Sequence, residues 1–415
     1  MEKKTGMSSI MGGDHWIWGI YWMLCFISVV EIGSASSRLA YRELANDNPL
    51  MRHTTFLVVG FFIFGIGLQS LTRANIKWVK LFGMANYIVG VVLMALMPIF
   101  GRRINGAARD IFGIQPVELC KLGLIIVLCM AIAAPKTSFT RWPIFRKSTE
   151  LRRFLFLILM IVLAAIPIAI QNLSSALILG FAALGIMFVG EVKGKYLIRT
   201  IVSVSIAAGL FLGMLFGLHK FNQSQEEGGG PHHTDIGLFS RANVWEQRIF
   251  DGSDIPLWEQ KINDDNMQVM YAHMAIANSN AIGRFVGDSQ LRDHLPEAYS
   301  DYIYCIIFEE LGVIGAAVVM LLYFILFWRC YRISKKTDNP FKRLLMIAIP
   351  LMIIIQALIH IGVCTDAMFV TGQPLPLISR GGMAILSTSA CFGILFGLSH
   401  DILREEQNRL ASPQQ

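Results

Sequence analysis

Charged residues are scarce in this chain of 415 residues: Asp, Glu, Lys and Arg make up 16% of it, whereas 54% of the residues are hydrophobic. The mean hydropathy of +0.54 lies well outside the range of soluble globular domains. The composition therefore excludes a soluble globular protein and indicates an integral membrane protein without a separate soluble domain.

Cysteine is missing from the long polar segment 219–301, where oxidation would matter. All seven cysteines lie in or at the edge of apolar segments, so they are interpreted as packing residues and no disulfide framework is predicted. Zinc-finger spacings and aromatic-rich RNA-binding motifs are missing, so we expect no nucleic-acid partner. The net charge of +7 is interpreted as attraction to the inner leaflet of a membrane.

Long apolar runs, in contrast, recur along the whole chain. Ten of them approach the length of about 20 residues that crosses a bilayer as a helix, and the first is too long for a cleaved signal peptide. They predict an all-α, polytopic membrane protein with about ten transmembrane helices in a single domain, residues 1–415. The predicted spans are 16–35, 55–72, 82–100, 117–134, 154–170, 173–190, 198–218, 302–329, 344–363 and 382–400.

Basic residues indicate the orientation. They are concentrated in segments 136–153 and 329–343, on the same side of the membrane as the N-terminus. The positive-inside rule therefore predicts a cytoplasmic N-terminus, and an even number of spans places the C-terminus there too. The long loop 219–301, between helices seven and eight, then lies outside. Residues 266–289 of this loop are apolar at helical spacing, which predicts helices folded back onto the membrane surface.

Carboxylates continue from this loop into the eighth span, in the stretch LPEAYSDYIYCIIFEELG (295–312). Glu297, Asp301 and Glu309 share one face of a helix because they are separated by multiples of four residues. Asp301 is predicted at the outer mouth of the span, with Glu309 about two turns deeper. Glu297 is equally well explained as a solvated residue ahead of the helix start.

Glu309 and Glu310 need a further explanation, because both fall inside the apolar run. Ionisable groups at membrane depth face a cavity or pair with another charge, and they are candidates for function. A partner is therefore expected, with Lys121 and Arg380 as the candidates.

A second polar stretch, GRRINGAARDIFGIQPVELCKLG (101–123), lies at the outer start of the fourth span. It places Arg103, Arg109, Glu118 and Lys121 around a Gly-Ile-Gln-Pro break. Two interpretations remain open. The cations are interfacial anchors that reach toward lipid headgroups, or they form a cationic rim for phosphate, since Arg offers a bidentate fork.

Two further stretches interrupt apolar runs. In VTGQPLPLISRGGMAIL (370–386), the prolines and the Gly381-Gly382 pair predict non-helical backbone. Such backbone is tolerated at membrane depth only where it is buried in protein or lines a cavity. In IQNLSSALILG (170–180), Asn172 and Ser175 stand at a helix start, and helix capping explains them.

These four stretches resemble the motifs of the SEDS family (shape, elongation, division and sporulation proteins). QPVELCKL is similar to QPSE-x-x-KL, LPEAYSDYIYCIIFEELGVIG to LPEAHTDFIF…EELG-x-IG, TGQPLPLISRGG to TG-x-PLPFISYGG, and NLSSALIL to a weakened DLGTA-x-x-L. The resemblance covers nearly the whole chain, including the ten spans and the long outer loop. It implies a peptidoglycan glycosyltransferase in the bacterial cytoplasmic membrane. Such an enzyme polymerises lipid II on the outer face, together with a class B penicillin-binding protein transpeptidase and other divisome or elongasome proteins.

Some positions depart from the family pattern. Ala108-Arg109-Asp110 stands where the family has Arg-Arg-Trp, Arg380 replaces an aromatic residue, and Phe369 replaces a proline. A run of glycines is replaced by Ala-Asn-Ser-Asn at 277–280. The central Asp301 and the EELG segment are intact.

The resemblance also implies roles for individual residues. Asp301 is the expected general base, which accepts a proton from the acceptor sugar as it attacks the donor's anomeric carbon. The leaving pyrophosphate requires positive charge, from the Arg and Lys of the rim or from a divalent cation, Mg or Mn; no ligand spacing demands a metal. The expected substrate-binding residues are Glu297, Arg103, Arg109, Gln115, Lys121, Gln268 and Ser379, and the expected buried structural charges are Glu118, Glu309 and Glu310.

Two other classes of function remain open: a lipid II flippase and a non-catalytic divisome scaffold. A transporter is expected to have paired broken helices and charges near the bilayer midplane. Here the best-placed carboxylate, Asp301, is at the outer mouth and no internal repeat is present, which favours the enzyme. Within the family, the length and the absence of an extra domain favour a division-type, FtsW-like member over an elongation-type one.

Overall fold

A computed structural model of the protein describes residues 12–36, 49–104, 107–111, 113–135, 149–204, 206, 213, 262, 266–295, 298–368 and 372–411. The chain divides into two compact units. One comprises Met1–Gly190 and Asn263–Gln415, and the other is Glu191–Ile262, in which residues 194–204 are helical. The expectation of a single domain is not tested by these two units and stays a prediction.

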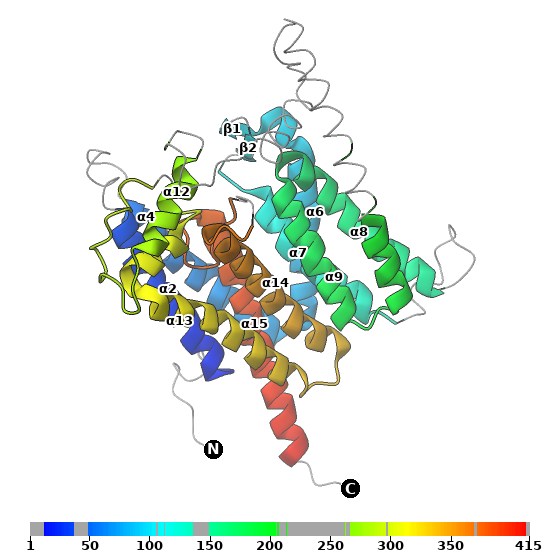
Figure 1. The fold of residues 1–415 in the computed structure, drawn as a ribbon. Helices are drawn as coiled ribbons and strands as arrows, with labels where there is room; N and C mark the ends of the chain where they lie inside the picture. The colour runs from blue at the N-terminus through cyan, green and yellow to red at the C-terminus, as the bar shows by residue number, and fades with distance from the viewer. Residues whose placement is uncertain are drawn as a thin grey trace, which may run out of the picture. The chain divides into compact units, whose positions relative to one another are not determined.

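The larger unit is built almost entirely of helices, joined at one point by a two-stranded antiparallel hairpin (Figure 1). Its elements are α2 (His15–Ala35), α4 (Pro49–Val59), η1 (Gly60–Ile66), α5 (Gly67–Ala74), α6 (Ile76–Phe100), β1 (Arg102–Ile104), β2 (Ala107–Asp110), α7 (Pro116–Ala133), α8 (Thr149–Gln171), α9 (Leu173–Val189), α12 (Met267–Ala277), α13 (Ile303–Ser334), α14 (Pro340–Cys364) and α15 (Gly382–Ala411).

Eight helical segments in the described part of the chain are long and apolar enough to cross a membrane. In one of them, Pro49–Ala74, the helices α4 and α5 are continuous through the π-helical η1. The sixth predicted span corresponds to a shorter apolar helix, Ser174–Val189. Most of the seventh, 198–218, lies outside the described residues. The prediction of an all-α, multi-pass membrane protein is confirmed, with the small hairpin as an addition.

Local sequence explains where several helices begin. Asp14 caps α2, because its Oδ1 accepts hydrogen bonds from the amides of Trp16 and Ile17. Asn172 caps α9 by accepting from the Ser175 amide at 3.1 Å, as helix capping predicts for that stretch. Pro116 stands in the first turn of α7, where its missing N–H costs no helical hydrogen bond.

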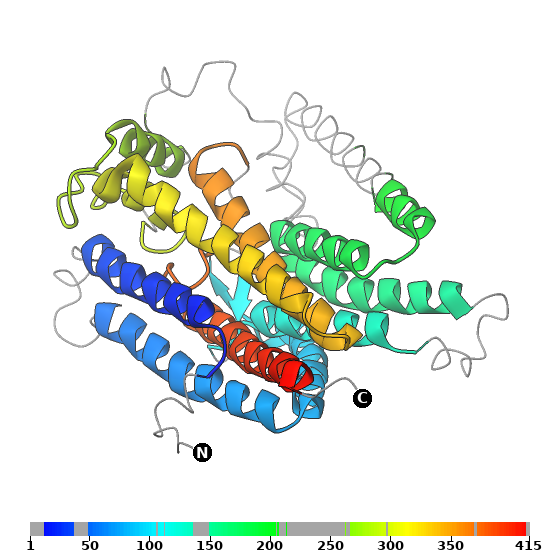
Figure 2. The ribbon, with the colours of Figure 1, turned by 90° about the horizontal axis from the view of Figure 1, so that it is seen from below.

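Three helices form the centre of the larger unit. The spanning windows of α7 and α15 are 78% buried and that of α14 is 72% buried, whereas that of α8 is 17% buried. In Figure 2, α2 lies alongside α15 and α13. The helices with apolar exposed faces surround this centre, which is the arrangement expected of a bundle in lipid.

The two ends of the bundle differ, and we name them by what they contain. At the terminus end, where α2 begins and α15 ends, ion pairs join the helices: Arg329 Nη2 lies 2.6 Å from Asp14 Oδ2, and Lys342 Nζ lies 2.7 Å from Glu405 Oε1. At the opposite end of the bundle, here called the site end, lie α12, the hairpin and the start of α13 (Figure 1).

Candidate functional site

Asp301 lies in the turn that leads into α13 at the site end, and it is half-buried. The Ser300 hydroxyl donates to its Oδ1 at 3.1 Å. Its carboxylate faces Gly372, whose φ is +59° and on which a Cβ atom would lie 3.4 Å from Asp301 Oδ2. Because Gly372 is itself exposed, the carboxylate borders the surface at this point.

The segment 372–381, here called the QPLP loop, lies against the Asp301 turn and is largely buried. Side chains from three helices satisfy its carbonyl groups. Gln356 of α14 donates to Pro374 O at 3.1 Å, Tyr323 of α13 donates to Pro376 O at 2.7 Å, and Ser28 of α2 donates to Ile378 O at 3.0 Å. The predicted non-helical backbone is confirmed, and of the two alternatives left open for it, burial in protein or lining a cavity, most of the loop shows burial in protein.

Ser379 joins the QPLP loop to the Asp301 turn. Its Oγ accepts from the Leu375 amide and donates to Ser300 O, each at 2.7 Å, and the residue is 1% exposed. The hydroxyl therefore both accepts and donates a hydrogen bond, and it fixes the backbone of Ser300, which precedes Asp301. This geometry describes a positioning residue, while substrate contact by Ser379 stays a prediction.

His360 of α14 is a site residue that sequence reasoning missed. It is 1% exposed, and its Nδ1 lies 2.7 Å from Gln373 O, so this nitrogen carries the proton, because a carbonyl only accepts. Its Nε2 lies 3.6 Å from Cys364 Sγ, which in turn lies 3.8 Å from Asp301 O. The available signal was the spacing of four between His360 and Cys364, which puts polar groups on one face of an otherwise apolar helix.

The EELG segment contains a break in α13. Gly312 has φ 70° and ψ −174°, so the helical hydrogen-bond ladder is interrupted there. The free carbonyls of Glu309 and Glu310 accept from the Arg284 amide at 3.0 Å and the Phe285 amide at 2.9 Å. On the other side of the break, the Val313 and Ile314 amides donate to the carbonyls of Asn280 and Ala281. Segment 280–285 therefore seals the break with its own backbone.

Glu309 and Glu310 are both fully buried. Glu309 accepts from Ser289 Oγ at 2.5 Å and from the Gln290 amide at 3.0 Å. Glu310 accepts from Ser34 of α2 and lies 3.8 Å from Arg292 Nη1.

The expectation that Lys121 or Arg380 is the partner of these carboxylates is wrong, because the cation beside Glu310 is Arg292. Arg292 reaches Glu310 because the loop that contains it folds back onto the broken helix.

The stretch at the start of α7 forms a second polar cluster. Lys121 Nζ lies 2.6 Å from Glu118 Oε1, and both side chains are buried, with exposures of 1% and 10%. The Gln115 carbonyl accepts from the Glu118 amide at 3.2 Å. Lys121 is thus neutralised inside the bundle and does not stand on an open rim.

The other predicted site residues lie apart from these clusters or outside the description. Arg103 and Arg109 lie on β1 and β2, but their side chains fall outside the described residues. Glu297 also lies outside the described residues. Gln268 is half-exposed on α12. In the described part of the chain, no group of three His, Cys, Asp or Glu side chains is placed to hold a metal ion.

The helix α12 covers the first part of the segment 266–289 that is predicted to be helical, whereas residues 278–289 are turns and irregular backbone. It packs against α13 and, less extensively, α14. His273 Nε2 lies 3.7 Å from Asp366 Oδ2 beyond the end of α14, and the Tyr271 ring lies 5.8 Å from the His294 ring. These contacts hold α12 over the end of the bundle at which Asp301 is located.

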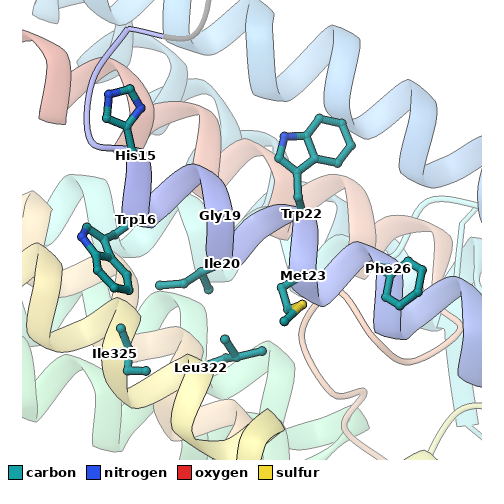
Figure 3. Close-up of a pocket in the computed structure, with 9 residues that line it drawn as sticks. All are labelled: His15, Trp16, Gly19, Ile20, Trp22, Met23, Phe26, Leu322 and Ile325. Atoms are coloured by element: carbon teal, nitrogen blue, oxygen red, sulfur yellow. The ribbon is translucent and has the colours of Figure 1, made fainter.

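A cavity of about 550 Å³ lies elsewhere, between α2 and α13 (Figure 3). It is lined by His15, Trp16, Gly19, Ile20, Trp22, Met23, Phe26, Leu322 and Ile325. His15 follows Asp14, which pairs with Arg329 at the terminus end. The cavity is therefore remote from Asp301, and its lining is mostly apolar.

The fold and the site define a multi-pass membrane protein in which the half-buried Asp301 lies at one end of the helix bundle. The family model of FtsW, RodA and SpoVE cell cycle proteins matches residues 14–403, and the chain belongs to this family. Among curated relatives, it is 27% identical to a probable peptidoglycan glycosyltransferase FtsW of Geobacter metallireducens, over 91% of this chain and 92% of that protein. It is 28% identical to a protein of the same description from Enterococcus hirae, over 96% and 94%.

Solved structures have the same fold. A chain solved in a study of polymerization and crosslinking by a peptidoglycan synthase complex matches with a TM-score of 0.65 and 19% identity, covering 94% of this chain and 98% of that one. The rod shape determining protein RodA of Thermus thermophilus matches with a TM-score of 0.58 and 20% identity, over 94% and 97%. At these identities the likeness establishes the fold alone.

Proposed function

We propose that the protein is a peptidoglycan glycosyltransferase that polymerises lipid II at the outer face of the bacterial cytoplasmic membrane. Family membership and the descriptions of the curated relatives support this assignment. The observation that carries it is the contrast among the carboxylates. Glu118, Glu309 and Glu310 are buried and held by partners, whereas Asp301 is half-buried beside the exposed Gly372.

In the proposed reaction, Asp301 is the general base. A hydroxyl of the acceptor sugar attacks the anomeric carbon of the donor, and Asp301 takes the hydroxyl proton. A new carbon–oxygen bond forms with inversion as the bond to the donor's diphosphate breaks, and the electron pair leaves with the polyprenyl diphosphate. Ser379 supports this step by donating to Ser300 O, and Cys364, which lies 3.6 Å from His360 Nε2, supports it by contacting Asp301 O.

The remaining site assignments are parts of the same proposal. Arg103 and Arg109 on the hairpin are proposed to face the diphosphate, with Mg or Mn as an alternative source of positive charge. Gln115, Gln268 and Glu297 are proposed to contact the sugars. Because Lys121 is buried against Glu118, its effect on the substrate is indirect, through the position of the start of α7.

The orientation and the partners belong to the proposal as well. Arg329, Lys336 and Lys342 gather at the terminus end, and the positive-inside rule then favours cytoplasmic termini with Asp301 outside. The likeness to a chain from a peptidoglycan synthase complex supports a class B penicillin-binding protein as the transpeptidase partner. The break in α13 is closed by backbone hydrogen bonds from segment 280–285, which favours an enzyme over a flippase.

The direct test is a polymerisation assay with purified lipid II, with and without a class B transpeptidase partner. We expect glycan strands from the wild-type protein, and a loss on the order of 10²–10⁴ in rate for Asp301→Asn, with an unchanged melting temperature. Asn keeps the shape of the side chain but cannot accept the proton. Near wild-type polymerisation by Asp301→Asn would remove Asp301 from the role of base. Lipid II transfer across vesicles without polymer would support the flippase instead.

A further inference from the structure

Arg380, the last residue of the QPLP loop before the Gly381-Gly382 pair, is anchored beside the Asp301 turn. Its amide donates to Tyr299 O at 2.9 Å, and its guanidinium carbon lies 4.9 Å from the centre of the Tyr299 ring. Tyr299 and Asp301 are two residues apart, which is at most about 7 Å of chain. The contacts with Tyr299 therefore keep the backbone of Arg380 near the Asp301 turn. The neighbouring Ser379 strengthens this link through Ser300 O.

The guanidinium of Arg380 lies over an aromatic ring, whereas four buried or half-buried cations of the bundle lie beside carboxylates. Lys121, Arg292, Arg329 and Lys342 each lie within ion-pair distance of a carboxylate. The side chain of Arg380 lies against the Tyr299 ring, and among the described residues no ion pair joins it to a carboxylate. A cation–π contact orients a guanidinium but leaves its N–H donors available. Arg380 is also half-exposed, so these donors border the surface at the site end.

We propose that Arg380 binds the diphosphate of the lipid-linked donor; this inference rests on the proposed function. In an inverting displacement, the attacking and leaving oxygens lie on opposite sides of one carbon, and the groups that serve them in glycosidases are about 6.5–9.5 Å apart. A cation held beside the Asp301 turn by Tyr299 is placed to meet the leaving diphosphate. The planar fork of Arg suits phosphate oxygens.

The experiment measures binding of farnesyl diphosphate to the purified full-length protein, with farnesol as the uncharged probe. We expect Arg380→Gln to weaken farnesyl diphosphate binding about 10- to 100-fold, the range of one or two charge-assisted hydrogen bonds, without changing farnesol binding. Arg380→Lys, which keeps the charge but loses the fork, should lie between. Arg332→Gln is the matched control, because Arg332 is exposed near the opposite end of α13, and it should bind like wild type.

Two results separate the outcomes. Equal affinity of wild type and Arg380→Gln for farnesyl diphosphate overturns the role of Arg380, even if lipid II is polymerised. Diphosphate binding that depends on Arg380, in a protein that makes no polymer, supports the site and overturns the proposed function. If Arg380→Gln does not fold, Arg380→Tyr replaces it, since the SEDS pattern accommodates an aromatic residue there, and the same loss of affinity is expected.

Discussion

At the scale of single residues, the chemistry of each carboxylate depends on what surrounds it. Glu118 faces Lys121, Glu309 accepts two hydrogen bonds, and Glu310 is shared between Ser34 and Arg292. A buried carboxylate with such partners is held in one place and is costly to disturb. Asp301 is half-buried and accepts one described hydrogen bond, from Ser300, so it retains the capacity to accept a proton.

His360 offers a prediction at this scale, because it supports the Asp301 turn without facing the surface. His360→Leu removes the donor to Gln373 O and leaves a buried carbonyl unpaired, which costs about 1–3 kcal/mol. We expect kcat for polymerisation to fall about 10- to 100-fold, as for a misplaced catalytic group, with little change in KM. His360→Asn is the control, since its amide can donate to the same carbonyl and should restore most of the rate. A rise in KM with unchanged kcat would contradict a positioning role.

At the scale of elements, the broken helix α13 and segment 280–285 depend on each other. Gly283 has φ +88° and Gly312 φ +70°, in the left-handed region that favours glycine. A Cβ on Gly283 would lie 2.2 Å from Glu310 O, and one on Gly312 would lie 2.4 Å from Gly283 N. The two glycines therefore allow the two backbones to cross, and this crossing brings the loop that contains Arg292 and Ser289 to the buried glutamates.

Gly312→Ala is therefore expected to be strongly destabilising. The left-handed backbone costs an alanine about 1–3 kcal/mol, and the overlap with backbone atoms adds a further cost, because neither segment can rotate away. Thermal unfolding in detergent should show a clear fall in melting temperature, together with less protein in the membrane. Gly180→Ala on α9 is the matched control, since nothing lies within 4 Å of a Cβ there, and it should be neutral or slightly stabilising. Equal melting temperatures for the two variants would contradict the proposed crossing.

The sequence predicts these elements unevenly, for physical reasons. Apolar runs predict the spans directly, because lipid requires about 20 apolar residues in a helix. The prolines and glycines near Gly381 likewise predict non-helical backbone. The partner of Glu310 could not be predicted, since Arg292 reaches it only through the fold of a long loop. His360 was missed because one polar residue in an apolar helix has no partner until the QPLP loop is placed beside it.

At the scale of the whole molecule, function depends on which side of the membrane each end faces. Lipid-linked sugars on the outer leaflet reach Asp301 only if the site end is outside. The long loop 219–301, with 13 Asp and Glu against 6 Lys and Arg, and the cations gathered at the terminus end both favour this orientation, because basic residues are retained on the cytoplasmic side. The proposed mechanism therefore requires the site end of the bundle to face the outside of the membrane.

Cysteine labelling of intact cells tests this orientation. All seven native cysteines are buried, so they should contribute little background. Gly229→Cys, in the long loop, should react with a membrane-impermeant maleimide in intact cells, whereas Lys335→Cys, which follows α13 at the terminus end, should react only after permeabilisation. The native chain without either substitution controls for background, and each variant must retain polymerase activity to be informative. Labelling of Lys335→Cys in intact cells, with Gly229→Cys protected, would place Asp301 in the cytoplasm. The substrate would then have to be used before it crosses the membrane, and the mechanism at the outer face would be wrong.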